Sequence, residues 1–398
     1  MGDLKFKIVY FQQDGELTGS AISLRHFLSG INRNLFEPVV ILANDGPARF
    51  LYESLEIEVK VFHFRTFWTF PGPNCLSREM INQLRALLPN KNLERFVTEQ
   101  IKPDIIHIND KAALNVGISL KNSGIPIIQH SRSSYHVTRC SIGKLLSKNN
   151  IRDFADHIIC ISEDEEDGFE HIKNKSIIYN TVDFDLINKA KKSRLEIRGS
   201  FNIKPEEFLV GFAANVTEKK GAWDFLELCK NLKDLRGVKF ILVGLISETG
   251  KTNLGNGVFL NMTPKEYVES FIRNHKLEGQ FIITGFRNDS LELMAAMDLL
   301  IVPNKNGVLG RQPIEAQAIG TPIIAVNGHS GRSKIILNNE TGYLVRDINE
   351  AILLTEKFVM NKANMKMSNA AKEYALKNFS PDKNMRIIEA IYLNLISK

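Results

Sequence analysis

Short apolar runs alternate with amphipathic stretches of helical period along both halves of the chain. This alternation is typical of repeated βαβ units built on a parallel sheet. The runs that we interpret as strands in the first half are 5–10, 38–42, 59–62, 104–108, 125–128, 157–161 and 176–179. Those of the second half are 208–212, 238–243, 281–283, 299–302 and 322–326. The pattern therefore predicts an α/β protein with two Rossmann-like sheets.

A chain of 398 residues is too long for one ordinary core, so we expect two domains. The segment 188–204 is charged and helical in character and lacks a strand pattern, which favours a boundary near residue 190. We predict an N-terminal domain over 1–189, a C-terminal domain over 190–378 and a final helical segment over 379–398. A ligand cleft is expected between the two domains.

The composition, with 43% hydrophobic and 24% charged residues, is that of an ordinary globular protein. No apolar run approaches the length of a membrane span and no signal-peptide pattern opens the chain, so we expect a cytoplasmic protein. A net charge of +6 favours phosphate-rich substrates or an anionic membrane surface. Because the basic residues are dispersed, we expect no nucleic acid partner. The basic, partly apolar stretch 142–148 fits either a solvated helix or peripheral contact with the inner face of the membrane.

The segment 298–325 is the most informative part of the second half. Its first residues, 298–304, are predicted to form a buried parallel strand, and the following loop leaves the strand's carboxyl end, where open α/β sheets bind ligands. Pro313 suits a first helical position and Glu315 the first turn of the helix. This arrangement suits a phosphate-bearing ligand, and ordinary helix capping is the alternative.

Several motifs occur in a familiar order in this half. They are Gly285-Phe-Arg-Asn-Asp289, Asp298-Leu-Leu-Ile-Val-Pro303, Gly310-Arg311, Ile314-Glu-Ala316, Gly320-Thr-Pro-Ile-Ile-Ala325 and Thr341-Gly-Tyr-Leu-Val345. Together they resemble family 4 of the retaining glycosyltransferases. The resemblance implies the GT-B architecture of two Rossmann-like domains facing a cleft, with a C-terminal helix that returns to the N-terminal domain. It also implies transfer of a hexose from a nucleotide diphosphate sugar, with a UDP-sugar such as UDP-glucose favoured, to a glycan or lipid-linked acceptor in polysaccharide biosynthesis.

The resemblance also assigns roles to residues of the second half. Glu315 is expected to bind the ribose hydroxyls, Lys220 the diphosphate, and 285–287 the base. The complete set expected around the donor is Gly19, Asn215, Lys220, Gly285, Phe286, Arg287, Gly307, Val308, Leu309, Gly310, Arg311 and Glu315. His130, Lys220 and Glu315 are the expected catalytic residues. The reaction is expected to retain the anomeric configuration and to need no metal, other cofactor or covalent nucleophile.

Two positions depart from the family pattern. Asn215 stands where the family carries an Arg on the diphosphate, so Arg311 or the amides of Gly307 and Val308 are alternative phosphate contacts. Gly307 stands eight residues before Glu315, where the family usually has a second Glu that contacts the donor sugar. These departures leave open the donor sugar and a catalytically silent, sugar-nucleotide-binding relative. A sugar-nucleotide epimerase of similar architecture is a more distant alternative.

In the first half, two predicted strands end in polar residues. His130 and Arg132 resemble the family's His-bearing strand end, which implies that His130 holds a hydroxyl of the donor sugar. We assign Arg132, His107, Asn109 and Trp68 to the acceptor side. Trp68 belongs to the aromatic segment 64–73, for which stacking on the acceptor and local core packing are both open interpretations.

Two further patterns suggest other chemistry at first sight. Asp183-Phe184-Asp185 is similar to the metal-binding pair of other glycosyltransferases, but its context favours an interdomain crossover, and we predict no divalent metal. The segment 244–252 is similar to a phosphate-binding P-loop but has five residues between its glycines where that motif requires four. We interpret it as a surface loop. The four cysteines lack the paired spacing of a zinc or redox site, and the oligomeric state is left open.

Overall fold

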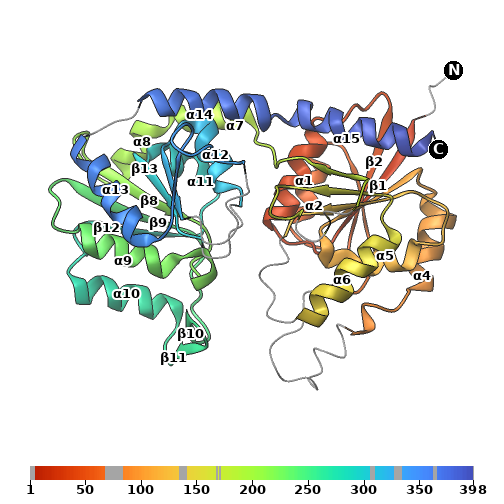
Figure 1. Ribbon diagram of the computed structural model, residues 1–398, viewed down its shortest axis with the longest axis horizontal. Coiled ribbons are helices and arrows are strands. Elements are labelled where there is room, and N and C mark those ends of the chain that lie inside the picture. Colours follow the sequence, from red (N-terminus) through yellow and green to blue (C-terminus); the bar gives the residue numbers. More distant parts are fainter. Residues whose placement is uncertain are drawn as a thin grey trace. The chain divides into compact units, whose positions relative to one another are not determined.

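The computed structural model divides into two compact units. Unit 1 comprises 1–181 and 381–398, and unit 2 comprises 182–380 (Figure 1). The residues that the structure describes are 5–67, 84–133, 141–166, 169, 172–304, 310–326, 334–361 and 365–397. The boundary lies at 181/182 rather than near 190, because α7 (Phe184–Lys192) packs on α11 (Ser290–Ala296) and α12 (Gln312–Ile319) of unit 2.

Unit 1 contains a parallel sheet of seven strands in the order β3-β2-β1-β4-β5-β6-β7. The strands are β1 (Phe6–Gln12), β2 (Phe36–Leu42), β3 (Glu58–Val61), β4 (Ile105–Asn109), β5 (Ile127–Ser131), β6 (His157–Cys160) and β7 (Lys175–Ile177). Each overlaps one of the predicted runs. Every residue of β4 and β5 is buried, as expected for central strands covered on both faces.

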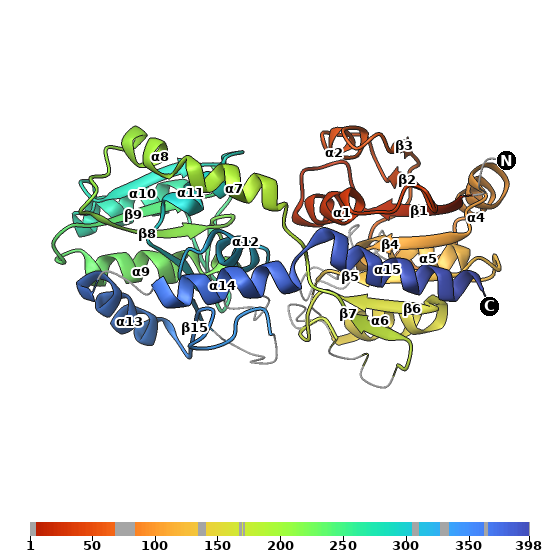
Figure 2. The same ribbon diagram turned by 90° about the horizontal axis from the view of Figure 1, so that it is seen from above.

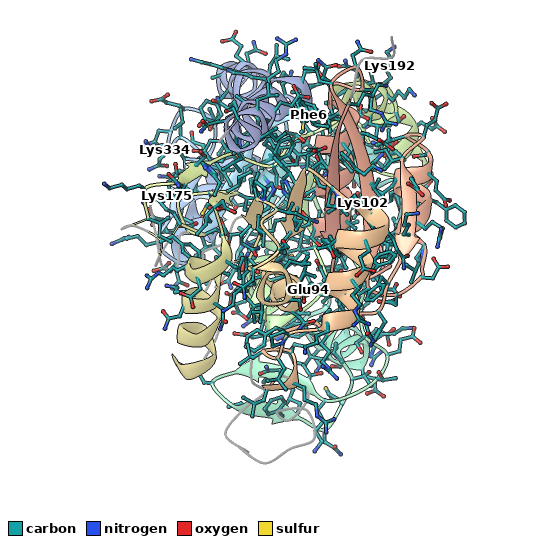
Figure 3. The ribbon with its side chains drawn as sticks, turned by 90° about the vertical axis from the view of Figure 1, so that its right-hand side faces the viewer. Phe6, Glu94, Lys102, Lys175, Lys192 and Lys334 are labelled. Atoms are coloured by element: carbon teal, nitrogen blue, oxygen red, sulfur yellow. The ribbon has the colours of Figure 1, made fainter. Side chains whose placement is uncertain are left out.

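The two faces of this sheet are covered by different helices. Because side chains alternate along a strand, Val9 and Phe11 of β1 join one hydrophobic cluster while Ile8 and Tyr10 join the other. The helical segments of unit 1 are α1 (Gly19–Ser29), α2 (Ala48–Glu53), α4 (Lys91–Arg95), η1 (Phe96–Ile101), η2 (Lys111–Ala113), α5 (Leu114–Leu120), α6 (Ser141–Phe154) and α15 (Pro381–Ile396). α1 and α15 pack side by side on the Ile8 face, and α15 runs along it (Figure 2). On the opposite side of unit 1, η1 ends at Ile101, and the next residue, Lys102, adopts a left-handed conformation just before β4 (Figure 3).

Unit 2 contains a parallel sheet of six strands in the order β12-β9-β8-β13-β14-β15. The strands are β8 (Phe208–Ala213), β9 (Val238–Val243), β12 (Phe281–Gly285), β13 (Leu299–Val302), β14 (Ile323–Val326) and β15 (Tyr343–Val345). The helices besides α7, α11 and α12 are α8 (Arg194–Ser200), η3 (Glu218–Lys220), α9 (Ala222–Leu232), α10 (Pro264–His275), α13 (Ile348–Asn361) and α14 (Met365–Asn378). A small antiparallel hairpin, β10 (Thr252–Gly255) and β11 (Val258–Leu260), follows the loop that resembles a P-loop; the sequence interpretation did not anticipate it.

No helix within the described ranges is long and apolar enough to cross a bilayer. In open α/β folds, ligands bind at the carboxyl ends of the parallel strands, so this edge of each sheet is the place to look for a site.

Candidate functional site

Lys220 lies at the carboxyl edge of the unit 2 sheet. It ends η3, whose first residue follows the cap Thr217, and Thr217 Oγ1 accepts a hydrogen bond from the Lys220 backbone N–H (3.3 Å). The next residue, Gly221, has φ +76°, and a Cβ there would come within 1.8 Å of the Pro303 carbonyl oxygen. Only glycine lets this loop lie so close to the end of β13.

Lys220 thereby shares a small cavity of about 10 Å³ with the ends of β8 and β13. Asn304 and Gln312 also line this cavity, and Asn304 is buried. Burial lowers the pKa of the Lys220 amine from its usual value. A partly desolvated cation at this edge suits a phosphate ligand, whose charge would offset the loss of hydration.

Glu315 and Arg311 form a buried ion pair at the start of α12. Arg311 Nη2 lies 2.6 Å and Nε 3.0 Å from Glu315 Oε1, and the side chains are 15% and 13% exposed. Glu315 lies in the first turn, as predicted, whereas Pro313 occupies the second helical position rather than the first, because the helix already begins at Gln312. The spacing of four residues brings the two side chains onto one face of the helix. Arg311, which we considered as a phosphate contact, thus orients the Glu315 carboxylate in this structure.

The segment after β12 carries an exposed aromatic ring. Gly285 has φ +68° and turns the chain, after which Phe286 is 60% exposed. Arg287 is held by Asp289 through two short hydrogen bonds of 2.7 and 2.5 Å. An exposed aromatic ring at the carboxyl end of a strand offers a stacking surface for a nucleotide base.

Replacing Phe286 by alanine is expected to weaken donor binding about tenfold, since a base stacked on an aromatic ring contributes on the order of 1–3 kcal/mol. Because the side chain is exposed, the free energy of unfolding should change by less than about 0.5 kcal/mol. Calorimetric titration with UDP measures the affinity. Phe50→Ala, which removes another exposed Phe from α2 of unit 1, is the matched control and should bind UDP like the wild type.

The remaining predicted donor contacts of unit 2 are less defined. Gly310 has φ +28°, and Asn215 is exposed after β8. Gly307, Val308 and Leu309 lie outside the described residues, so the predicted amide contacts and the departure at Gly307 stay predictions.

The structure bears on two further predictions for unit 1, the glycine of the first loop and the aromatic segment 64–73. A Cβ at Gly19 would meet nothing within 4 Å, whereas one at Gly15 would approach the Gly46 amide nitrogen to 2.6 Å, so Gly15 is the glycine that this loop requires. Phe64 and Phe67 are buried in the core, which supports the packing interpretation for these two members of the aromatic segment. Trp68 lies outside the described residues.

The predicted polar residues of unit 1 come together at the carboxyl ends of β4 and β5. His107, Asn109 and His130 are fully buried, and Arg132 is 8% exposed. His107 Nε2 lies 3.1 Å from His130 Nδ1, and Arg132 Nε donates to Asn109 Oδ1. Arg132 Nη1 donates to Asn180 Oδ1 (2.7 Å).

Burial, followed by the nearby Arg132 charge, lowers the pKa of His107 to about 3 and that of His130 well below its ordinary value. Both imidazoles are therefore neutral at physiological pH. The sequence interpretation missed their partners Tyr10 and Tyr392, which come from opposite ends of the chain and carry no local motif.

Glu165 is a buried carboxyl group after β6. Burial and then the neighbouring Asp164 raise the pKa of Glu165 to about 8, although a hydrogen bond from Ser162 Oγ (2.6 Å) acts in the opposite direction. The group is therefore largely protonated in the folded state at neutral pH and ionised in the unfolded state.

This pKa difference predicts a pH-dependent stability. Between the ordinary pKa of about 4.5 and the folded-state pKa of about 8, the folded state holds a proton that the unfolded state releases. The free energy of unfolding should therefore fall as pH rises through this window, by up to about 1.4 kcal/mol per pH unit from this group. Urea unfolding of Glu165→Gln at several pH values should show a shallower slope. An unchanged slope would contradict the assignment, and Glu99→Gln at an exposed position is the control.

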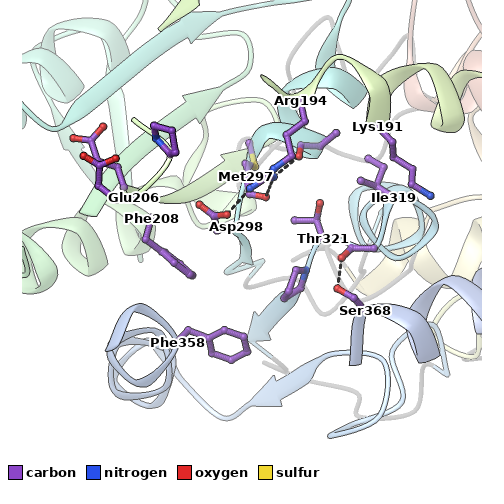
Figure 4. Close-up of a pocket in the computed structure, with 15 residues that line it drawn as sticks. Lys191, Arg194, Glu206, Phe208, Met297, Asp298, Ile319, Thr321, Phe358 and Ser368 are labelled. Atoms are coloured by element: carbon purple, nitrogen blue, oxygen red, sulfur yellow. Dashed lines mark hydrogen bonds and ion pairs between the residues drawn. The ribbon is translucent and has the colours of Figure 1, made fainter. Parts of the chain in front are cut away.

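A larger cavity, of about 500 Å³, opens at the amino-terminal edge of the unit 2 sheet (Figure 4). Its polar lining groups are engaged with one another: Arg194 Nη2 contacts Asp298 Oδ1 (2.5 Å), and Ser368 Oγ donates to the Gly320 carbonyl oxygen (2.5 Å). This edge is opposite to the one that carries Lys220 and Glu315, and we assign no part of the donor site to it.

Metal binding was predicted to be absent. Across the described ranges, no group of three or more His, Cys, Asp or Glu side chains is arranged to hold a metal ion. Asp183, the first acid of the suspected metal pair, caps α7 by accepting hydrogen bonds from the Asp185 and Leu186 amides (3.0 and 3.1 Å). Metal independence stays a prediction.

Comparison with known proteins places this architecture in a class. The structure of Anabaena Alr3699/HepE in complex with UDP and glucose superposes with a TM-score of 0.75 at 21% identity, covering 97% of this chain and 99% of that one. A sucrose-phosphate synthase from Thermosynechococcus elongatus superposes with a TM-score of 0.74 at 16% identity, covering 99% and 100%. The fold is thus the two-domain GT-B fold of glycosyltransferases.

The sequence comparisons identify the family. Residues 17–186 match the model of Glycosyltransferase Family 4, and 193–377 match that of Glycosyl transferases group 1. The UDP-Gal:alpha-D-GlcNAc-diphosphoundecaprenol alpha-1,3-galactosyltransferase of Escherichia coli is 23% identical over 98% of this chain and 98% of its own. The O-antigen biosynthesis glycosyltransferase WclY of Escherichia coli is 24% identical over 50% of this chain and 51% of its own. The chain therefore belongs to the family 4-like GT-B glycosyltransferases.

Proposed function

We propose that this glycosyltransferase moves a hexose from a UDP-sugar to a glycan or lipid-linked acceptor in polysaccharide biosynthesis, with retention of anomeric configuration and without a metal ion. The observation that carries the proposal is the pairing of Glu315 with Arg311 at the start of α12, in the same unit and at the same sheet edge as the half-buried Lys220. A fixed carboxylate suits two ribose hydroxyls, and a half-buried ammonium suits a diphosphate.

The chemistry follows from these groups. As the bond between the sugar and the diphosphate breaks, negative charge grows on the leaving phosphate, and Lys220 stabilises it electrostatically. The acceptor hydroxyl attacks from the face that the diphosphate leaves and gives its proton to the leaving phosphate oxygen, so the configuration is kept and no side chain forms a covalent bond. Glu315 positions the nucleotide, and His130 of unit 1 holds a hydroxyl of the sugar.

The comparisons support the choice of donor. One relative is named for its use of UDP-Gal, and solved neighbours of the same fold contain UDP or UDP-glucose. The relatives named for O-antigen and capsular polysaccharide biosynthesis support the choice of pathway class.

The exposed Asn215, at the place of a family Arg, motivates the alternative of a silent relative that binds the donor but transfers nothing. Purified protein should be titrated calorimetrically with UDP-glucose, UDP-galactose and GDP- and ADP-sugars in the presence of EDTA, and the products analysed by mass spectrometry. Binding of a UDP-sugar with slow release of sugar supports the proposal. Binding without release supports the silent relative, and conversion of the donor to its epimer supports an epimerase. The anomeric signal of a transferred sugar in proton NMR then tests retention.

A further inference from the structure

A line of buried hydrogen bonds runs through unit 1 and ends at His130. Tyr10 Oη of β1 lies 2.9 Å from Tyr392 Oη of α15. Tyr392 Oη lies 2.7 Å from His107 Nδ1, and His107 Nε2 lies 3.1 Å from His130 Nδ1. All four side chains are at most 1% exposed. Water therefore does not compete for these bonds.

Arg132 determines which group donates and which accepts in these hydrogen bonds. Its Nη2 lies 3.3 Å from His130 Nδ1, and a guanidinium group can only donate hydrogen bonds. His130 Nδ1 must therefore be the bare, accepting nitrogen of the ring. His107 Nε2 faces the same lone pair, so it must carry a hydrogen as well.

The other bonds then have only one possible direction. A neutral His107 with its hydrogen on Nε2 has a bare Nδ1, which accepts the hydroxyl hydrogen of Tyr392. The Tyr392 oxygen in turn accepts the hydroxyl hydrogen of Tyr10. Each donor thus has one acceptor, from Tyr10 through Tyr392 and His107 to His130.

The last ring of the line has its hydrogen on Nε2. Within the described residues, His130 Nε2 has no hydrogen-bond partner although the side chain is fully buried. A buried N–H group left without a partner costs on the order of 1–3 kcal/mol, a cost that a bound ligand can remove.

We propose that His130 meets its ligand as a neutral hydrogen-bond donor through Nε2, and that Arg132, together with Tyr392 acting through His107, are positioning residues that hold the ring in this tautomer. The identity of the ligand rests on the proposed function: the group opposite Nε2 is an accepting oxygen of the donor, from a sugar hydroxyl or a phosphate. His130 therefore does not remove a proton from the acceptor hydroxyl during transfer. The C-terminal helix α15 acts on the site through the Tyr392 hydroxyl.

The tautomer is measurable without any substrate. In protein labelled with ¹⁵N only at histidine, two-bond proton couplings distinguish a protonated from a bare ring nitrogen, and loss of one signal set in His130→Gln assigns the ring. We expect His130 to have its hydrogen on Nε2 and to be neutral between pH 7 and pH 8, because burial and then the Arg132 charge lower the pKa of the ring. A hydrogen on Nδ1, or an imidazolium in this range, would overturn the proposal.

Two matched variants test the positioning role. Tyr392→Phe removes the hydroxyl that His107 Nδ1 accepts, whereas Tyr10→Phe removes an equally buried hydroxyl one step farther away. We expect Tyr392→Phe to shift the His107 Nδ1 signal and to reduce the ratio of Nε2–H to Nδ1–H His130 roughly fivefold, the equivalent of one hydrogen bond. Tyr10→Phe should leave the His130 signals nearly unchanged. Identical His130 spectra for Tyr392→Phe and wild type would overturn the role of Tyr392.

The kinetic measurement uses UDP-glucose or whichever UDP-sugar binds. The fall in kcat/KM for sugar release or transfer in Tyr392→Phe should equal the fall in the fraction of His130 that carries Nε2–H, as the ¹⁵N spectra measure it, while Tyr10→Phe stays within about twofold. If the tautomer is found but no nucleotide sugar binds any form of the protein, the proposed function fails while the tautomer assignment stands. If a nucleotide sugar binds but the His130 hydrogen is on Nδ1, the tautomer assignment fails while the proposed donor binding stands.

Discussion

Glu315→Ala is expected to reduce UDP-sugar affinity at least 100-fold and to destabilise the fold by about 3 kcal/mol. The affinity is lost because each ribose hydroxyl bond to a charged carboxylate contributes roughly 1.5–3 kcal/mol. The stability is lost because the change leaves the guanidinium of Arg311 mostly buried without its carboxylate, and breaking such a pair costs roughly 3–5 kcal/mol. Calorimetric titration with UDP and urea unfolding measure the two effects separately.

The chain offers a matched control for this variant. Arg346 and Glu350 form an ion pair of the same spacing at the start of α13, but Arg346 is 89% and Glu350 42% exposed. Glu350→Ala should therefore change stability by less than about 1 kcal/mol and leave UDP affinity unchanged. Glu315→Ala protein that is folded at the assay temperature and binds UDP as tightly as the wild type would remove Glu315 from the donor site.

Lys220→Ala is expected to lower kcat about 100-fold, with a smaller effect on the donor affinity. The Lys220 charge acts mainly where negative charge develops on the leaving diphosphate, and removal of one such group from an active site costs roughly 100-fold to 1000-fold. Single-turnover sugar release, followed by mass spectrometry, measures the effect on the chemical step.

Lys219→Ala is the matched control, because Lys219 is the neighbouring lysine of η3 and its side chain is exposed. Its rate should stay within about twofold of the wild type. Equal rates for the two variants would contradict a special role of Lys220, whose place in the cavity beside Asn304 would then have no effect on the chemical step.

The strands that sequence alone predicted well are those that lie buried within a parallel sheet. Runs such as 238–243 and 299–302 coincide with β9 and β13, because strands covered on both faces consist almost wholly of apolar residues. The hairpin of β10 and β11 escaped prediction because most of its residues are only half-buried or exposed and lack such an apolar run. The unit boundary was placed too late because the charged surface of α7 hides the packing of Ile187 and Ala190 within unit 2.

The site residues that could be predicted from the sequence are those at or just after the ends of predicted strands. His107, Asn109, His130 and Arg132 come together because neighbouring parallel strands end at one edge. Their partner Tyr392 was not predictable, since 285 residues separate it from His107 and only the packing of α15 brings them together. The engagement of Arg311 by Glu315 was also missed, although the spacing of four residues on a helix was a usable signal.

Helix α15 has a consequence for synthesis of the protein. Met385, Ile388 and Tyr392 are part of the same hydrophobic core as β1 and α1, and Asn384 Nδ2 donates to the Tyr179 carbonyl oxygen (3.0 Å). The hydrophobic core of unit 1 is therefore incomplete until residues 381–396 have been translated, whereas unit 2 is continuous over 182–380. We therefore expect unit 2 to complete its folding before unit 1, which reverses the usual order on the ribosome, in which the first domain folds first. A nonsense mutation between unit 2 and α15 should therefore damage unit 1, the half of the protein that was made first.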